Sequence, residues 1–148
     1  MSTRTELIDA FEACTLPREQ WTHQAHLLMG FWYLRTLPRE EAAERIKGGL
    51  LRLIAAWGIV TTLERGYHET ITQFYIHMIG RYVEATRQET DWEKLTTGLL
   101  QECGPKELPF RYYSKERLNS WEARTRWVEP DLCQLPASSV ESYAAGAP

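Results

Sequence analysis

Three of the four histidines in this chain lie in two short clusters that could share one site. His23 and His26 are three residues apart, so on a helix both imidazoles point from one face and can reach one ion or substrate. The stretch at residues 25–34 carries no Asp, Glu, Lys or Arg, which predicts a buried helix. Buried polar groups need hydrogen-bond partners or a ligand, so the pair marks a candidate site.

The second cluster holds His68 and Glu69, just before the start of another predicted helix. A third imidazole beside the first pair, with one coordination position left open, would suit a catalytic divalent metal such as zinc. Two histidines and one carboxylate would suit iron instead, with the carboxylate from Glu69 or from Glu19, one turn before His23. At such a site Glu69 would orient a histidine or act as the base, and Tyr67 would donate a proton.

The same histidines also have a structural interpretation. His26 could donate to a backbone carbonyl, and His23 could bond to Glu19. His68 and Glu69 could together cap the free backbone amides at a helix start. At the level of sequence, both a functional pocket and a hydrogen-bonded core network remain open.

A further group with binding chemistry lies near residue 120. Arg117, Trp121 and Arg124 fall at i, i+4 and i+7 and would share one helix face, flanked by Tyr113. Arginine and aromatic side chains hold planar or anionic ligands through bidentate hydrogen bonds and cation–π contacts. We therefore predict that Arg117, Trp121 and Tyr113 contact a small anionic substrate. Alternatively, the arginines pair with nearby carboxylates and hold the last segment against the body.

Proline, glycine and capping residues divide the chain into helices. They predict helices over residues 4–14, 17–37, 38–57, 70–87, 91–103 and 114–126, with loops at 59–69 and 104–113 and an extended segment at 127–132. Gly48 and Gly49, inside the third helix, predict close helix packing or a kink. The expected fold is all-α, an irregular single-domain bundle of five to seven helices over residues 1–135. A flexible C-terminal tail at 136–148 is expected to follow.

Composition narrows the classes of partner. A formal net charge of -3 gives no electrostatic reason to expect nucleic-acid binding. No apolar run of about 18 residues occurs, so we expect no membrane span. The three cysteines are odd in number and form no Cys-x-x-Cys pair, which predicts reduced thiols in a cytoplasmic protein.

Three motifs carry a resemblance to known sequences. WTHQAHL at residues 21–27, YHET at 67–70 and WVEPDL at 127–132 resemble motifs of a group of small bacterial helical proteins. The resemblance spans residues 11–132 and implies a bacterial protein with a helical fold. It implies no particular activity.

Two hypotheses for function follow. The first is a histidine-rich pocket, with or without a divalent metal, that acts on a small anionic molecule. The second is a non-catalytic helical module that binds a ligand or forms a homodimer, and whose histidines satisfy one another in the core.

Overall fold

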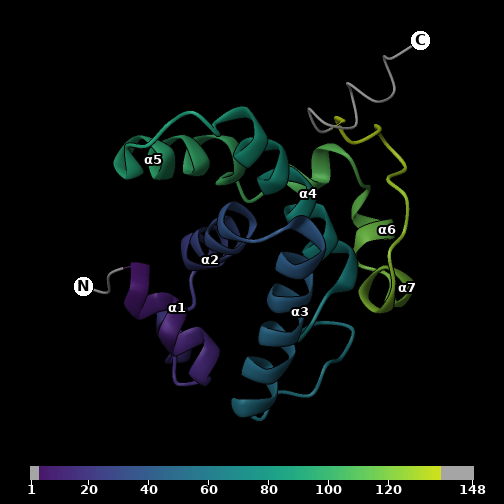
Figure 1. Cartoon of the computed structure of the whole chain (residues 1–148). Coiled ribbons are helices and arrows are strands. Elements are labelled where there is room, and N and C mark those ends of the chain that lie inside the picture. The colour runs from purple at the N-terminus through teal and green to yellow at the C-terminus, as the bar shows by residue number, and fades with distance from the viewer. Residues whose placement is uncertain (1–3, 138–148) are drawn as a thin grey trace.

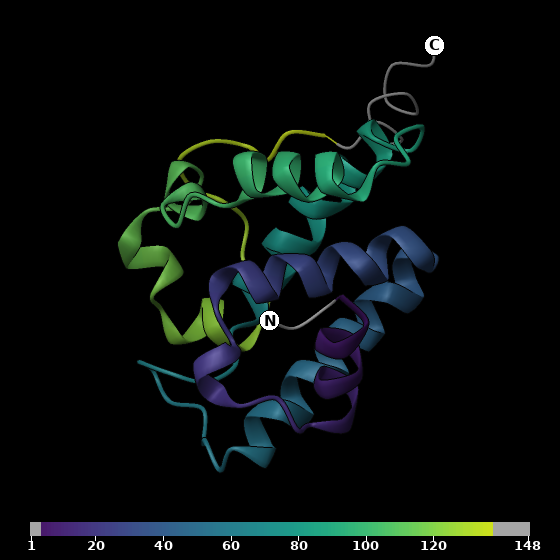
Figure 2. The same ribbon diagram turned by 90° about the vertical axis from the view of Figure 1, so that its left-hand side faces the viewer.

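The helix that begins at the histidine pair lies at the centre of the fold. In the computed structural model, which describes residues 4–137, α2 (His23–Thr36) contacts all four of the other long helices. These are α1 (Arg4–Ala13), α3 (Arg39–Ala56), α4 (Glu69–Ala85) and α5 (Trp92–Cys103). Figure 1 shows α2 nearly end-on among them, and Figure 2 shows it crossing the molecule between α5 and α3.

Short helices complete the fold and confirm the all-α prediction. They are α6 (Lys115–Leu118), α7 (Trp121–Thr125) and two 3-10 turns, η1 (Arg18–Gln20) and η2 (Leu108–Arg111). Across residues 4–137 there are seven α-helices and no strand. In the same range, every helix is too short or too polar to cross a lipid bilayer.

A capping threonine sets where α2 begins. The side-chain oxygen of Thr22 accepts a hydrogen bond from the Ala25 amide at 3.1 Å, which satisfies one of the free amides of the first turn. The prediction of one helix over residues 17–37 is therefore wrong. The chain forms the separate 3-10 turn η1 and then starts a new helix. Glu19 is exposed on that turn and does not continue the face of His23.

Gly49 allows α1 and α3 to approach closely. A Cβ atom at this position would overlap the ring of Phe11, which is only 1% exposed. The prediction of close helix packing is thus confirmed at Gly49, and α3 continues through the glycine pair.

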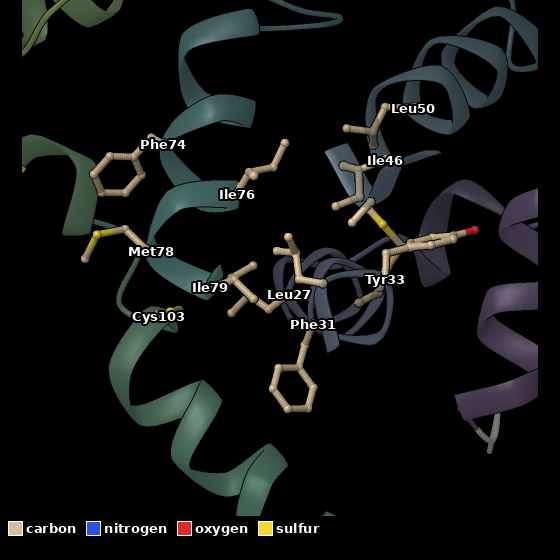
Figure 3. Packing of buried hydrophobic residues seen from close by; sticks show 14 of the residues in the cluster. Leu27, Phe31, Tyr33, Ile46, Leu50, Phe74, Ile76, Met78, Ile79 and Cys103 are labelled. Carbon is tan, nitrogen blue, oxygen red and sulfur yellow. The ribbon is translucent and has the colours of Figure 1, made fainter. Parts of the chain in front are cut away.

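Apolar side chains of α2, α3 and α4 meet in one core. Figure 3 shows Ile76 and Ile79 of α4 pointing toward Leu27 of α2 and toward Ile46 and Leu50 of α3. All five side chains are buried. The site described below lies among these three helices.

The predicted helix over residues 114–126 is two helices. Ser114 caps α6 by accepting from the Arg117 amide, and Ser120 caps α7 by accepting from the Ala123 amide, each at 3.1 Å. The new cap at Ser120 turns the chain between Arg117 and Trp121, so these two residues do not lie on one helix.

The extended segment after α7 is confirmed, and side chains hold it. The Tyr113 hydroxyl donates to the Val128 carbonyl at 2.7 Å, and the Val128 amide donates to the Thr70 hydroxyl at 3.2 Å. Further along, His77 bonds to the Pro136 carbonyl at 2.6 Å. The rest of the predicted tail, residues 138–148, lies outside the described residues.

Candidate functional site

His68 is the cap of α4. Its Nδ1 accepts from the Ile71 amide at 3.1 Å, and its Nε2 lies 2.8 Å from the Leu118 carbonyl oxygen, to which it must donate. Burial lowers the pKa of His68, the Leu118 hydrogen bond opposes this, and the positive charge of Arg124 lowers it further. Both ring nitrogens of the neutral imidazole are therefore in use. To bind a metal, His68 would have to give up one of these bonds.

This contact confirms the structural interpretation of His68 and corrects the predicted start of α4. The helix begins at Glu69, one residue before the predicted span of 70–87. The hydroxyl of Thr70 donates to the Arg126 carbonyl at 2.8 Å, so it ties α4 to the end of α7.

Glu69 and Tyr67 belong to a closed polar network between α3 and α4. The Tyr67 hydroxyl donates to one oxygen of Glu69 at 2.6 Å, and Lys47 and Gln73 donate to the other at 2.8 and 3.1 Å. Burial favours a raised pKa for Glu69, but the bonds from Lys47, Tyr67 and Gln73 outweigh it and lower the pKa. Burial and the bond to Glu69 raise the pKa of Tyr67. Neither group can exchange a proton with a substrate without breaking this network.

The predicted substrate contacts have three different environments. Tyr113 is fully buried, with its hydroxyl on the Val128 carbonyl. Trp121 is 53% exposed, and the Nε of Arg117 donates to the Glu129 carbonyl. Arg124 donates to the carbonyls of Gly66 and Tyr67. The arginines thus hold chain segments in place, but through backbone carbonyls and not through the carboxylate pairs that the structural alternative predicted. Of the two, Arg117 holds the last segment and Arg124 holds the loop before α4.

The three histidines do not form a joint ligand set. Within residues 4–137, no group of three or more His, Cys, Asp or Glu side chains is arranged to hold a metal ion. The metal remains a prediction, and it now depends on His23 and His26.

His23 and His26 do come together, in the wall of a hollow of about 290 Å³ between α2, α3 and α4, which we call the inner pocket. Its other lining residues are apolar except for Thr72 and the hydroxyl of Tyr75: Leu27, Met29, Leu34, Ile46, Leu50, Ile71, Thr72, Tyr75, Ile76 and Ile79. Sequence reasoning found the histidine pair but missed the α4 wall. The apolar spacing of α4 predicts burial and cannot indicate which face borders a hollow.

His26 is a neutral hydrogen-bond acceptor near pH 7. Its Nδ1 lies 2.9 Å from the Thr22 carbonyl oxygen, so this nitrogen must carry the proton and leave a lone pair on Nε2. The ring packs against Trp21, with centroids 4.0 Å apart. Burial lowers the pKa of His26 to about 4, the Thr22 bond opposes the shift, and the proximity of His23 adds to it.

His23 carries an unpartnered buried nitrogen. Its Nε2 is the only buried side-chain N or O atom in residues 4–137 that has no hydrogen-bond partner. The edge of the ring meets Tyr75, with centroids 5.5 Å apart and planes at 70°. A buried polar atom left unpaired costs about 1–3 kcal/mol. No group of residues 4–137 supplies a partner for this nitrogen, and the His23 side chain that carries it lines the inner pocket.

A larger hollow, of about 680 Å³, lies between α1, α2 and α5 and lacks this feature. Its one charged lining residue, Arg4, packs its guanidinium 4.1 Å from the centre of the Trp92 ring. No unpartnered buried side-chain atom of the described chain belongs to its lining. The inner pocket is therefore the better candidate site.

Comparison of the chain with protein-family models, with curated proteins and with solved structures found no match.

Proposed function

We propose that this chain binds a small, mostly apolar molecule in the inner pocket, with one polar group of that molecule paired to His23. The observation that carries the proposal is the unpartnered His23 Nε2 in the wall of an otherwise largely apolar hollow. A hydrogen bond from a ligand would remove the cost of that unpaired nitrogen.

The volume of the inner pocket supports a ligand. Protein cores are close-packed, and voids much larger than a water molecule are few. An apolar cavity of about 150 Å³ already holds a benzene molecule. At about 290 Å³, the inner pocket has room for a bicyclic aromatic ring or a medium-length alkyl chain.

The polar end of the pocket suits a group that can both donate and accept. Neutral His26 presents an acceptor nitrogen, and the tautomer of His23 is open. A hydroxyl or carboxyl group satisfies either arrangement. The predicted divalent metal fits the proposal as a companion of the ligand, because the two histidines would supply two nitrogen donors and the bound molecule the remainder.

A matched pair of probes tests the proposal. p-Cresol and toluene have similar shapes and differ in one hydroxyl, and their binding to the full chain can be measured by calorimetry or NMR titration. We expect p-cresol to bind about fivefold more tightly, which corresponds to one buried hydrogen bond. In His23→Phe this preference should shrink, because the ring volume remains and only the acceptor nitrogen of His26 is left at the polar end.

His77→Phe is the control for that substitution. His77 bonds to Arg39 and Pro136 and does not line the inner pocket, so this variant should keep the preference for p-cresol. Failure of both probes to bind, or a preference that is as large in His23→Phe as in the unmodified chain, contradicts the proposal.

A zinc titration tests the metal separately. Zinc binding that is lost in His23→Ala and kept in His77→Ala supports a metal at the histidine pair. Equal zinc binding by both variants and the unmodified chain contradicts it.

We also propose a cytoplasmic location. Cys14, Cys103 and Cys133 are free thiols in the structure, as expected for a protein in a reducing compartment.

A further inference from the structure

A second hollow, of about 270 Å³, adjoins the inner pocket, and we call it the outer hollow. Three residues line both: His23, Ile71 and Tyr75. The edge contact between the rings of His23 and Tyr75 thus lies at the wall that the two hollows share. A molecule that pairs with His23 from the inner pocket is therefore close to the outer hollow.

The two hollows carry one formal charge, and it is positive. Lys106 lines the outer hollow, and no Asp or Glu lines either one. Within residues 4–137, Lys106 has no hydrogen bond or ion pair. The adjacent Glu107 lies 3.7 Å from Arg111 instead. The ammonium group is thus free to meet an anion that arrives from the inner pocket.

Tyr75 adds a hydrogen-bond donor to the shared wall. Burial raises the pKa of Tyr75 to about 12, and the nearby Cys103 and Glu107 raise it in the same direction. The phenol therefore stays protonated near pH 7 and can donate to an oxygen of a bound anion.

We propose that the ligand is an amphipathic monocarboxylate, whose apolar body fills the inner pocket and whose carboxylate lies between His23, Tyr75 and Lys106. This inference rests on the proposed function, since it names the chemical class of the same ligand. A single lysine with neutral donors around it matches one negative charge. A phosphate, which carries more charge, is usually held by several cationic groups or by a cradle of backbone amides.

Octanoate and octanol are the probes that test this class, because they share an alkyl chain and differ in charge. By calorimetry on the full chain, we expect octanoate to bind about fivefold more tightly than octanol, as expected for one partly exposed charged contact. This advantage should shrink as salt concentration rises. Lys106→Met should abolish the advantage and leave octanol binding unchanged.

Further variants separate the outcomes. Lys94→Met removes another exposed lysine, on α5, and should leave the advantage of octanoate intact. Leu50→Phe fills the inner pocket from α3 and should weaken the binding of both probes. Ile76→Phe fills it from α4 and should have the same effect. Circular dichroism checks that the loss of binding is not unfolding.

If both probes bind, Leu50→Phe weakens both and Lys106→Met leaves their ratio unchanged, the carboxylate assignment is wrong and the proposed function stands. If neither octanoate nor octanol binds the unmodified chain while p-cresol does, the carboxylate assignment is wrong and the proposed function stands. If p-cresol also fails to bind, both proposals are wrong.

Discussion

A histidine can serve as a ligand or as a helix cap, and in this protein the contacts of each ring decide which. Both ring nitrogens of His68 form hydrogen bonds with the backbone, one with the Ile71 amide and one with the Leu118 carbonyl. The Nδ1 of His26 forms a hydrogen bond with the Thr22 carbonyl, and the Nε2 of His23 has no partner. The sequence predicts that these residues need partners, because they flank apolar helices. One partner of His68, the Ile71 amide, is three residues away, as expected for a helix cap. The other, the Leu118 carbonyl, is 50 residues away along the chain, and spacing cannot reveal it.

The cap at His68 predicts a stability defect that one substitution can partly repair. His68→Ala should lower the free energy of unfolding by about 2 kcal/mol, because the Ile71 amide loses its cap and the buried Leu118 carbonyl loses its donor. His68→Asn should recover part of the loss, since asparagine is a good helix cap. Urea denaturation measures both variants. Equal stability of His68→Ala and the unmodified chain contradicts the assigned cap.

His26 predicts a pH dependence of stability. Its folded pKa, about 4, lies below the ordinary value of 6.5, so between these values the unfolded chain binds more protons. Stability is therefore unaffected by His26 above pH 6.5 and falls as pH drops toward 4, by about 1.4 kcal/mol per pH unit.

Urea titrations of His26→Gln and the unmodified chain from pH 7 to pH 4 test this slope. Glutamine does not titrate, so the difference in unfolding free energy between the two proteins should change across this interval. A constant difference would show that His26 is not held neutral by burial.

At the level of elements, the sequence predicts the number and order of the long helices better than their ends. The predicted helices at 17–37 and 114–126 each contain a capping residue, Thr22 and Ser120, that starts a new helix inside the predicted span. Both carry a side-chain oxygen in the right place, but such residues also occur inside helices. Whether such a residue caps a new helix or lies inside one depends on the direction in which the chain must continue to pack against the other helices. The local sequence pattern does not contain that information.

The glycine pair of α3 offers a matched test of helix packing. Gly49→Ala should lower the free energy of unfolding by about 1–3 kcal/mol, because the new Cβ overlaps the Phe11 ring and forces α1 away from α3. Gly48→Ala is the control: its Cβ would meet only the end of the Arg52 side chain, at 3.2 Å, and that side chain is exposed and can move. The control should match or exceed the original stability.

Phe11→Leu supplies the second half of the test. In this background the penalty of Gly49→Ala should shrink, since the smaller side chain leaves room for the methyl group. If Gly49→Ala lowers the free energy of unfolding equally in both backgrounds, its effect does not come from overlap with Phe11.

At the level of the whole molecule, the inner pocket exists because three helices cross without filling the space between them. Its lining comes from residue 23 to residue 79, and no window of the sequence contains more than part of it. The sequence predicts that the stretch at residues 25–34, which includes Leu27, is buried. It does not predict where buried side chains fail to meet, because that depends on helix crossing geometry.

Filling the pocket predicts opposite changes in stability and binding. Leu50→Phe adds contacts where the core has few, so its melting temperature should rise by a few degrees, corresponding to about 1 kcal/mol, while p-cresol binding weakens. Leu51→Phe, at a neighbouring position that is 51% exposed, is the control and should change neither. Calorimetry measures both properties. A lower melting temperature together with intact p-cresol binding contradicts the assigned cavity.

The hydrogen bonds that hold residues 127–137 against the helices determine how easily this segment opens. Hydroxyl and imidazole groups of Thr70, Tyr113 and His77 hold this segment together with Ser114, Arg117 and Arg81, and no helix or strand includes it. Detaching it breaks these side-chain bonds and one backbone bond, from the Leu132 amide to the Tyr112 carbonyl, and leaves the long helices whole. We therefore expect it to open as a separate unit of low opening free energy. In deuterium-exchange experiments, we therefore expect its amides to exchange well before those of α2. The Val128 amide, which reports on Thr70, should be the slowest among them.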